Sequence, residues 1–135
     1  MAYKLNVKGV YDRATRSASV GGIMKRNGRW VRGLRGCIGL PDPVTAELWA
    51  IYYGLKMALE RNKTNPIVFS ECREAITIIR NDDPEYPIVM LVDMIRMMLA
   101  ENWTSVDIQP THADANEGAN VMAGYYLVHG GGGDP

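Results

Sequence analysis

The sequence predicts an α/β fold in which a five-stranded mixed sheet is flanked by helices. Three strand-like stretches fill the first 38 residues, and helix-like and strand-like stretches alternate after them. The predicted order is β-β-β-α-β-α-α-β-α, with three antiparallel strands followed by two parallel additions. A length of 135 residues, 47% of them hydrophobic, suits one domain. We place this domain at residues 1–129 and expect the glycine-rich segment 130–135 to be a disordered end.

The first three strands are expected at residues 3–10, 18–26 and 29–38. Asn27-Gly28 separates the second from the third and is a strong hairpin signal, because both residues tolerate positive φ. In the third stretch, Arg32 and Gly36 interrupt the apolar positions of one face. That strand is therefore expected near an edge of the sheet.

A helix is expected from Val44 to about Arg61, after Pro41 and Pro43 break the preceding strand. Its apolar residues recur every three or four positions and form one stripe: Leu48, Ile51, Tyr52, Leu55 and Leu59. Glu47 lies on the border of this stripe. We therefore expect its carboxylate to point toward the sheet and not squarely into water.

The second half of the chain alternates between strands and helices. Residues 66–69 are typical of a buried parallel strand, and a helix follows with Ser70 as its expected N-cap. The turn-rich segment 81–87 leads into a methionine-rich helix, which we attribute to packing. Residues 105–109 alternate like a strand, and a last helix is expected from about Ala115.

The net charge of zero conceals a basic N-terminal third. Residues 1–35 carry nine basic side chains and one acid, +8 in total, so the remainder carries −8. Such asymmetry is found on surfaces that bind nucleic acid, although the solvated faces of two or three strands would look the same. The candidate nucleic-acid-binding residues are Arg13, Arg16, Lys25, Arg26, Arg29, Arg32 and Arg35.

Cysteines and hydropathy bear on the compartment. Cys37 and Cys72 have no metal-ligand spacing and form no disulfide framework. The N-terminus lacks the apolar stretch of a signal peptide, and no run has the length of a membrane span. We therefore expect an intracellular protein, in the cytoplasm or nucleus, without a membrane partner.

Four short motifs suggest a family. They are Asn-Val-Lys-Gly at residues 6–9, Ala-Glu-Leu-Trp-Ala at 46–50, Ser-Glu-Cys at 70–72, and Ala-Asn-Glu-Gly-Ala-Asn at 115–120. Their order and spacing resemble the ribonuclease H-like superfamily over about residues 4–127, and in particular the plant reverse transcriptase-like domains derived from retroelements. The resemblance implies a five-stranded mixed sheet with flanking helices. It also implies cleavage of the RNA strand of an RNA–DNA hybrid by two divalent metals held by four acids.

The residues at the four acidic positions of the family are Lys8, Glu47, Glu71 and Asn120. Only Glu47 is the residue that the family usually has. The expected charge of the cluster changes from −4 to −1, which argues strongly against two divalent cations. We therefore expect no cofactor and treat Glu47 and Glu71 as remnants. Mg²⁺ or Mn²⁺ would be needed only if the domain is still an enzyme.

Lys8 lies in the middle of an apolar strand, where an unpaired ammonium would be costly. One interpretation places it between Glu47 and Glu71, in the position of a metal, so that the buried charges are paired. The other lets its side chain reach past the end of the sheet to water.

Other polar residues near the motifs have simpler explanations. Asp114 and Glu117 would compensate for Asn120 if they faced the cluster, but acids are ordinary at a helix N-terminus. His112 is expected to be a loop residue. Cys72 is expected to be an inert thiol, because no histidine partner can be identified for it.

Two functional hypotheses follow. The first is an inactive or severely impaired ribonuclease H-like domain that binds an RNA–DNA hybrid, another nucleic acid or a protein. The second is a metal-dependent endoribonuclease that cleaves the RNA strand of RNA–DNA hybrids.

Overall fold

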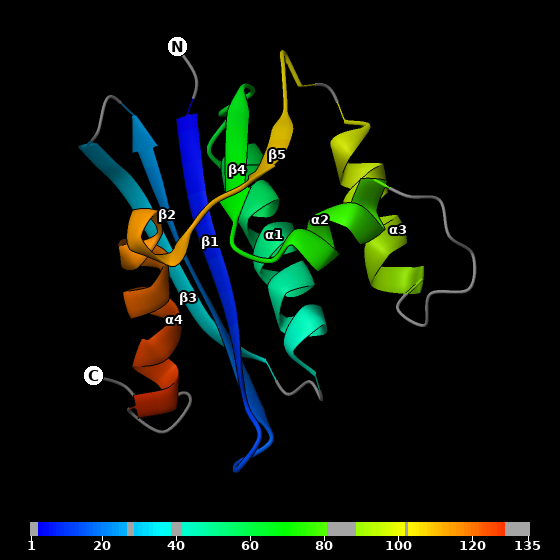
Figure 1. Cartoon of the computed structure of the whole chain (residues 1–135). Helices are drawn as coiled ribbons and strands as arrows, with labels where there is room; N and C mark the ends of the chain where they lie inside the picture. The colour runs from blue at the N-terminus through cyan, green and yellow to red at the C-terminus, as the bar shows by residue number, and fades with distance from the viewer. Residues whose placement is uncertain (1–2, 27–28, 39–41, 81–88, 102, 129–135) are drawn as a thin grey trace.

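The computed structural model describes residues 3–26, 29–38, 42–80, 89–101 and 103–128 (Figure 1). Within these, only the backbone is described for 29–38, 89 and 125–128. The predicted Asn27-Gly28 turn, Pro41, the 81–87 connector and the glycine-rich end all lie outside the described residues.

One mixed sheet of five strands forms the centre of the molecule, in the order β3-β2-β1-β4-β5. The first three strands, β1 (Tyr3–Asp12), β2 (Ser17–Arg26) and β3 (Arg29–Ile38), pair antiparallel. The strands β4 (Pro66–Ser70) and β5 (Asp107–Pro110) join parallel to β1 and to each other. The mixed α/β architecture predicted from the sequence is therefore confirmed. β3 lies at an edge, as its interrupted apolar pattern indicated.

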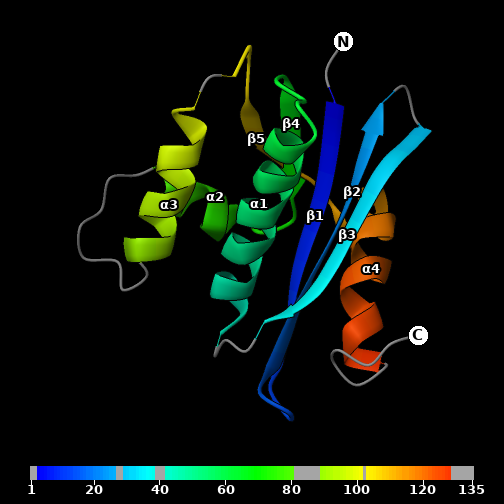
Figure 2. The same cartoon turned by 180° about the vertical axis from the view of Figure 1, so that it is seen from behind.

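Helices cover both faces of the sheet (Figures 1 and 2). On one face lies α1 (Pro43–Glu60), with α2 (Arg73–Arg80) and α3 (Val89–Leu99) beside it. On the other face lies α4 (Glu117–Val128), packed on β2 and β1. A short 3₁₀ turn, η1 (Ala113–Ala115), precedes α4 and was not expected. The last helix consequently begins two residues later than the apolar pattern predicted.

The hydrophobic core lies between the sheet and α1. Leu5 and Val7 of β1 are fully buried against the apolar stripe of the helix, which includes Leu48, Ile51 and Leu55. Burial of each such side chain stabilises the fold by about 1.5–3 kcal/mol. This packing fixes the rotation of α1, and Glu47, at the border of the stripe, is only 6% exposed.

The first turn of α1 is fixed by its cap. The Asp42 side chain accepts a hydrogen bond from the Thr45 backbone N–H at 2.8 Å, and Pro43 occupies the first turn, where its missing N–H costs nothing. The helix therefore starts at a defined residue. Glu47 consequently lies in the second turn, beside β1.

Gly9 allows α1 to approach β1 closely. A Cβ atom at Gly9 would lie 2.1 Å from the carbonyl oxygen of Ala46, a distance that no real Cβ adopts. Any larger residue would therefore push the helix away from the strand. The contact brings the backbone of Glu47 next to β1.

The methionine-rich helix α3 packs on one side only. Leu91, Val92 and Ile95 are buried, while Met90 and Met97 are 81% and 73% exposed. The buried residues confirm that one side of α3 packs on the core, while the expectation that the methionines form no site of their own stays a prediction. Among the described residues, none of the helices is both long enough and apolar enough to cross a membrane.

Candidate functional site

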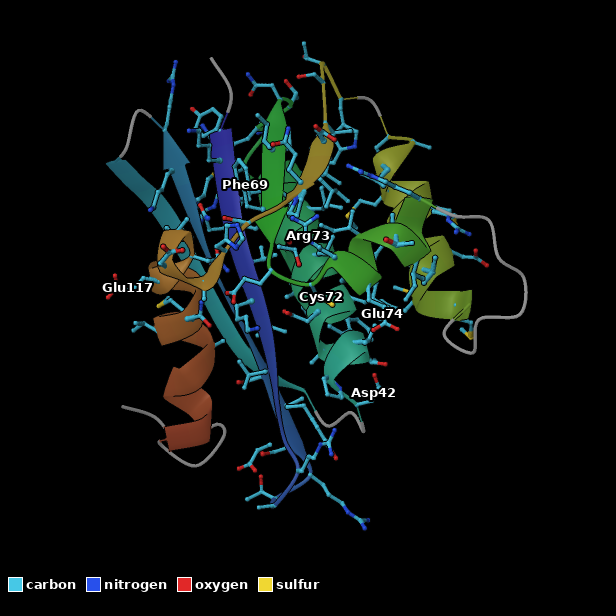
Figure 3. All side chains as sticks on the ribbon, viewed as in Figure 1. Asp42, Phe69, Cys72, Arg73, Glu74 and Glu117 are labelled. Atoms are coloured by element: carbon cyan, nitrogen blue, oxygen red, sulfur yellow. The ribbon has the colours of Figure 1, made fainter. Side chains whose placement is uncertain are left out.

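The four motif positions meet at the edge of β1 just beyond the end of β4. The parallel pairing of β1 with β4 ends at Val7 and Ser70, so Lys8 and Gly9 have no β4 partner. Glu71 directly follows β4, at the turn into α2 where Figure 3 labels the next residue, Cys72. The crevice beyond the carboxyl end of a strand is where open α/β sheets usually bind their ligands.

Lys8 bridges the two glutamates of this cluster. Its Nζ lies 3.2 Å from Oε2 of Glu47 and 3.8 Å from Oε1 of Glu71. The side chains of Lys8, Glu47 and Glu71 are 22%, 7% and 15% exposed. The internal ion pair predicted from the sequence is therefore present, and the ammonium does not simply extend into water.

Glu47 is held by two donors. Oε1 accepts a short hydrogen bond from the backbone N–H of Gly9, and Oε2 accepts one from Lys8. Burial raises the pKa of Glu47 above its ordinary value, while the Lys8 ammonium and the Gly9 N–H oppose this shift. The nearby Glu71 charge raises the pKa further. The balance favours the neutral form more than in water.

Glu71 accepts hydrogen bonds from two asparagine amides on its other oxygen. The distances from Oε2 are 2.6 Å to Nδ2 of Asn120 and 2.8 Å to Nδ2 of Asn116. The same nitrogen of Asn120 also donates to the Asn116 backbone oxygen at 3.0 Å. Both of these partners are acceptors, so Asn120 presents its N–H groups to the carboxylate and not its oxygen.

Two asparagines that were not selected from the sequence complete the network. Asn116 is 1% exposed and donates to the Val7 carbonyl oxygen at 3.0 Å. Its side-chain oxygen accepts from Asn6 Nδ2 at 2.9 Å. Buried amides need such partners. The available signal was that both residues lie inside the quoted motifs, beside Val7 and Ala115.

Every carboxylate oxygen of Glu47 and Glu71 has a partner within the protein. These partners are one backbone N–H, one ammonium shared by both glutamates, and two side-chain amides. In the described part of the chain, no group of three or more histidine, cysteine, aspartate or glutamate residues is arranged to hold a metal ion. The donor set that hard divalent cations prefer is thus not assembled among these residues.

The remaining candidates near the motifs lie toward solvent. His112, Asp114 and Glu117 are all exposed, with Glu117 in the first turn of α4 (Figure 3). Cys72 is partly buried, and its sulfur accepts from the Ala75 N–H at 3.4 Å. Cys72 thus caps α2, whereas the sequence suggested Ser70, which is the last residue of β4. Burial raises the pKa of the Cys72 thiol, which disfavours the reactive thiolate.

The predicted basic surface is divided between the two ends of the β1–β2 hairpin. Arg13 and Arg16 are exposed in the turn that joins the strands, while Lys25 and Arg26 end β2 at the opposite extremity. A ten-residue strand spans about 30 Å, so these pairs do not form one patch. The side chains of Arg29, Arg32 and Arg35 lie outside the described residues.

Solved structures with the same fold define the class of the protein. RNase H1 from the halophilic archaeon Halobacterium salinarum NRC-1 matches with a TM-score of 0.85 and 16% identity, over 96% of this chain and 99% of that one. The LC11-RNase H1, isolated from compost by a metagenomic approach, matches with a TM-score of 0.75 and 14% identity, over 93% and 99%. That protein was solved in complex with an RNA/DNA hybrid. The chain thus has an RNase H-like fold.

The family follows from the sequence itself. Residues 6–125 match the family described as reverse transcriptase-like, and the chain belongs to this family. A protein of Arabidopsis thaliana named "Putative ribonuclease H protein" is 27% identical over 124 residues, 90% of this chain. The chain spans only 20% of the length of that relative.

Proposed function

We propose that this chain is a ribonuclease H-like domain that binds an RNA–DNA hybrid without cleaving it. The observation that carries the proposal is the position of the Lys8 ammonium, in contact with both Glu47 and Glu71. A cation of the protein itself occupies the space between the two carboxylates that the family would use for metal ions.

Charge supports the absence of metal chemistry. The four family positions carry one lysine, two glutamates and one neutral amide, which sum to −1 when both glutamates are ionised. Burial raises the pKa of Glu47, which reduces the negative charge further. Two divalent cations would add +4 beside an ammonium, and like charges at such distances repel by several kcal/mol at protein-like dielectric.

The hydrogen bonds of Glu71 also support the proposed absence of metal chemistry. A metal that approached Glu71 would have to displace the amides of Asn116 and Asn120 from Oε2, and the ammonium of Lys8 from Oε1. Buried donors that lose their partners each cost about 1–3 kcal/mol. The residues present therefore do not fit the metal pair of the family, and no step of a reaction is assigned to them.

Hybrid binding is proposed from the fold and from the exposed cations. The LC11-RNase H1 of the same fold binds an RNA/DNA hybrid. Arg13, Arg16 and Arg26 of this chain are exposed and Lys25 is half-buried. They lie on β2 and the turn before it, where phosphate contacts need no acidic site. Binding through such contacts releases counterions, so affinity should fall steeply as salt rises.

The test combines binding and cleavage on one labelled hybrid. Fluorescence anisotropy should detect binding at about 50 mM salt that weakens by tenfold or more at about 200 mM, as expected for several phosphate contacts. Gel analysis in millimolar Mg²⁺ or Mn²⁺ should find the RNA strand intact. Metal-dependent cleavage that Glu47→Gln abolishes would instead establish the endoribonuclease. Absence of binding at low salt would refute the hybrid and direct attention to a protein partner.

Metal titration tests the cluster directly. We expect millimolar Mg²⁺ or Mn²⁺ to leave the NMR signals around Glu47 unmoved in the natural chain. The matched variant replaces the three altered positions, as Lys8→Asp, Glu71→Asp and Asn120→Asp, and should show perturbed signals there because four carboxylates then converge. Signals that move at Glu47 and Glu71 in the natural chain would contradict the proposal.

A further inference from the structure

A polar cleft lies at the start of β1, away from the Lys8 cluster at the middle of the strand. It is open to solvent, with a volume of about 310 Å³, and joins β1, β2, the loop after α1 and the loop before β5. We call it the Tyr3 cleft, and its lining includes Tyr3, Arg26, Asn62, Lys63, Thr64 and Thr104. Tyr3 and Lys8 are five positions apart, about 17 Å along an extended strand.

Two cations lie close to the aromatic ring of Tyr3. Cζ of Arg26 lies 5.3 Å from the ring centroid, and Nζ of Lys63 lies 4.8 Å from it. Arg26 also donates a long hydrogen bond, 3.4 Å, to the Tyr3 hydroxyl oxygen. Among the residues that the structure describes, no carboxylate forms an ion pair with either cation. Two positive charges that have no carboxylate partner among the described residues therefore face one small polar surface.

The backbone around Lys63 is fixed before any ligand binds. Asn62 adopts φ 57°, a left-handed conformation that asparagine tolerates. The N–H of Asn62 donates to Leu59 O at 3.0 Å, and the N–H of Lys63 donates to Ala58 O at 2.9 Å. These two bonds form the closing motif of a helix C-terminus. The ammonium is thus attached to a rigid loop, which lowers the entropic cost of binding a ligand.

A second loop is tied to the first. The N–H groups of Thr104 and Ser105 both donate to the Thr64 carbonyl oxygen, at 2.7 Å and 3.1 Å. The hydroxyl groups of Thr64 and Thr104 lie 3.0 Å apart. Two hydroxyls that can rotate their hydrogens are therefore held together beside the two cations.

Helix electrostatics explain only part of this arrangement. Lys63 follows the C-terminus of α1, where a cation offsets the negative end of the helix dipole. That effect does not account for Arg26, which comes from β2 and lies over the same ring.

We propose that the Tyr3 cleft binds a phosphate group through Arg26 and Lys63, with the threonine hydroxyls as further donors. Phosphate offers several acceptor oxygens, a guanidinium can donate to two of them, and an ammonium acts as a point charge. The open shape leaves room for a substituent on the phosphate. Both a free phosphate compound and the backbone of a nucleic acid would present the same group.

This site shares Arg26 with the cations proposed for hybrid binding, but it shares no residue with the Lys8 cluster, and phosphate binding does not require a hybrid. A chain that binds phosphate at this cleft but not the hybrid would retain the inference and lose the proposed function. Conversely, a chain that binds the hybrid but not phosphate at this cleft would retain the proposed function and lose only the inference.

The experiment is an NMR titration at constant ionic strength, with inorganic phosphate replacing chloride. The amide signals of Lys63, Thr64 and Thr104 should move together and saturate. Arg26→Gln and Lys63→Gln should each weaken binding by about tenfold, the loss of one charged hydrogen bond. The matched control is Lys56→Gln, an exposed lysine on α1 outside the cleft, which should bind as the natural chain does.

A ten-nucleotide single-stranded thymidine oligomer is the second probe. Movement of the same amides with both probes would identify a nucleic-acid backbone as a source of the phosphate, and movement with inorganic phosphate alone would identify a small phosphate compound. Amides that respond to neither probe would overturn the inference. Equal affinity of the Arg26, Lys63 and Lys56 variants would also overturn it.

Discussion

Two positions on strand β1, its middle at Lys8 and its start at Tyr3, use charged residues in opposite ways. At Lys8, one cation lies between two carboxylates, and all three side chains are largely buried. At Tyr3, two cations share one phenol ring in an open cleft, without a carboxylate ion pair among the described residues. The same strand therefore has one charge cluster that is internally satisfied and one that is not.

Solvent access explains the difference. Removing a charge from water costs several kcal/mol, so the buried cluster is stable only with its partners inside the protein. Cations at an open surface remain hydrated, so they are stable without an ion-pair partner and stay accessible to an anion. A cluster whose partners are all internal is expected to serve structure, while an unneutralised surface cluster is expected to bind.

Gly9→Ala should have the largest effect on stability, because it disrupts the packing of α1 on β1 beside the buried Lys8 cluster. The new Cβ would collide with the Ala46 backbone and force α1 away from β1. We expect a loss of about 3 kcal/mol in the free energy of unfolding, measured by urea denaturation. Gly124→Ala is the control, because a Cβ there meets nothing within 4 Å and alanine favours a helix. Equal stability of the two variants would show that α1 does not approach β1 as described.

Lys8→Met should come next. Glu47 and Glu71 would then face each other without a cation, and we expect a loss of about 2 kcal/mol, less than for a fully buried pair because Lys8 is partly exposed. Lys4→Met, at an exposed position on the same strand, should change stability by less than about 0.5 kcal/mol. Equal unfolding midpoints for Lys8→Met and the natural chain would contradict the ion pair.

The pH dependence of stability tests the protonation of Glu47 within the buried Lys8 cluster. Because burial raises the pKa of Glu47 in the folded state, the folded chain binds its proton more tightly than the unfolded chain. The resulting stability is present below the unfolded pKa of about 4.3 and is lost as pH rises through the folded pKa. Glu47→Gln lacks this proton. The free energy of unfolding of the natural chain, minus that of the variant, should therefore fall as pH rises from about 4; a rise would show that Lys8 outweighs burial.

The smallest expected effect is a change in the pKa of Tyr3 in the open Tyr3 cleft. Lys63, followed by Arg26, lowers the pKa of the Tyr3 phenol. Lys63→Gln should raise that pKa toward the ordinary tyrosine value, Arg26→Gln should raise it less, and Lys56→Gln should leave it unchanged. The Tyr3 ring signals, followed by NMR as pH rises, measure this. An unchanged pKa in Lys63→Gln would place the ammonium away from the ring.

Short-range patterns in the sequence were sufficient for the mixed sheet, the apolar stripe of α1 and the lysine at the position of a family acid. These depend on the alternation of side chains within a strand, on the turn of a helix and on motif spacing, all of which a linear chain records. The ion pair followed from the same motifs, because a buried ammonium requires an anion and two glutamates stood at matching positions.

Contacts between distant segments were decided only by the tertiary structure. Asn6 meets Asn116 from 110 positions away, and the Tyr3 cleft draws on residues 3, 26, 63 and 104. The hairpin direction also separated the basic residues that the sequence grouped by composition. The physical reason is that the sequence gives the residue types and their local periodicity. Which polar atoms of distant residues face each other depends on strand register and helix packing. Lys8 was recognisable from the sequence. That Arg26 and Lys63 lie together without a carboxylate partner among the described residues was not.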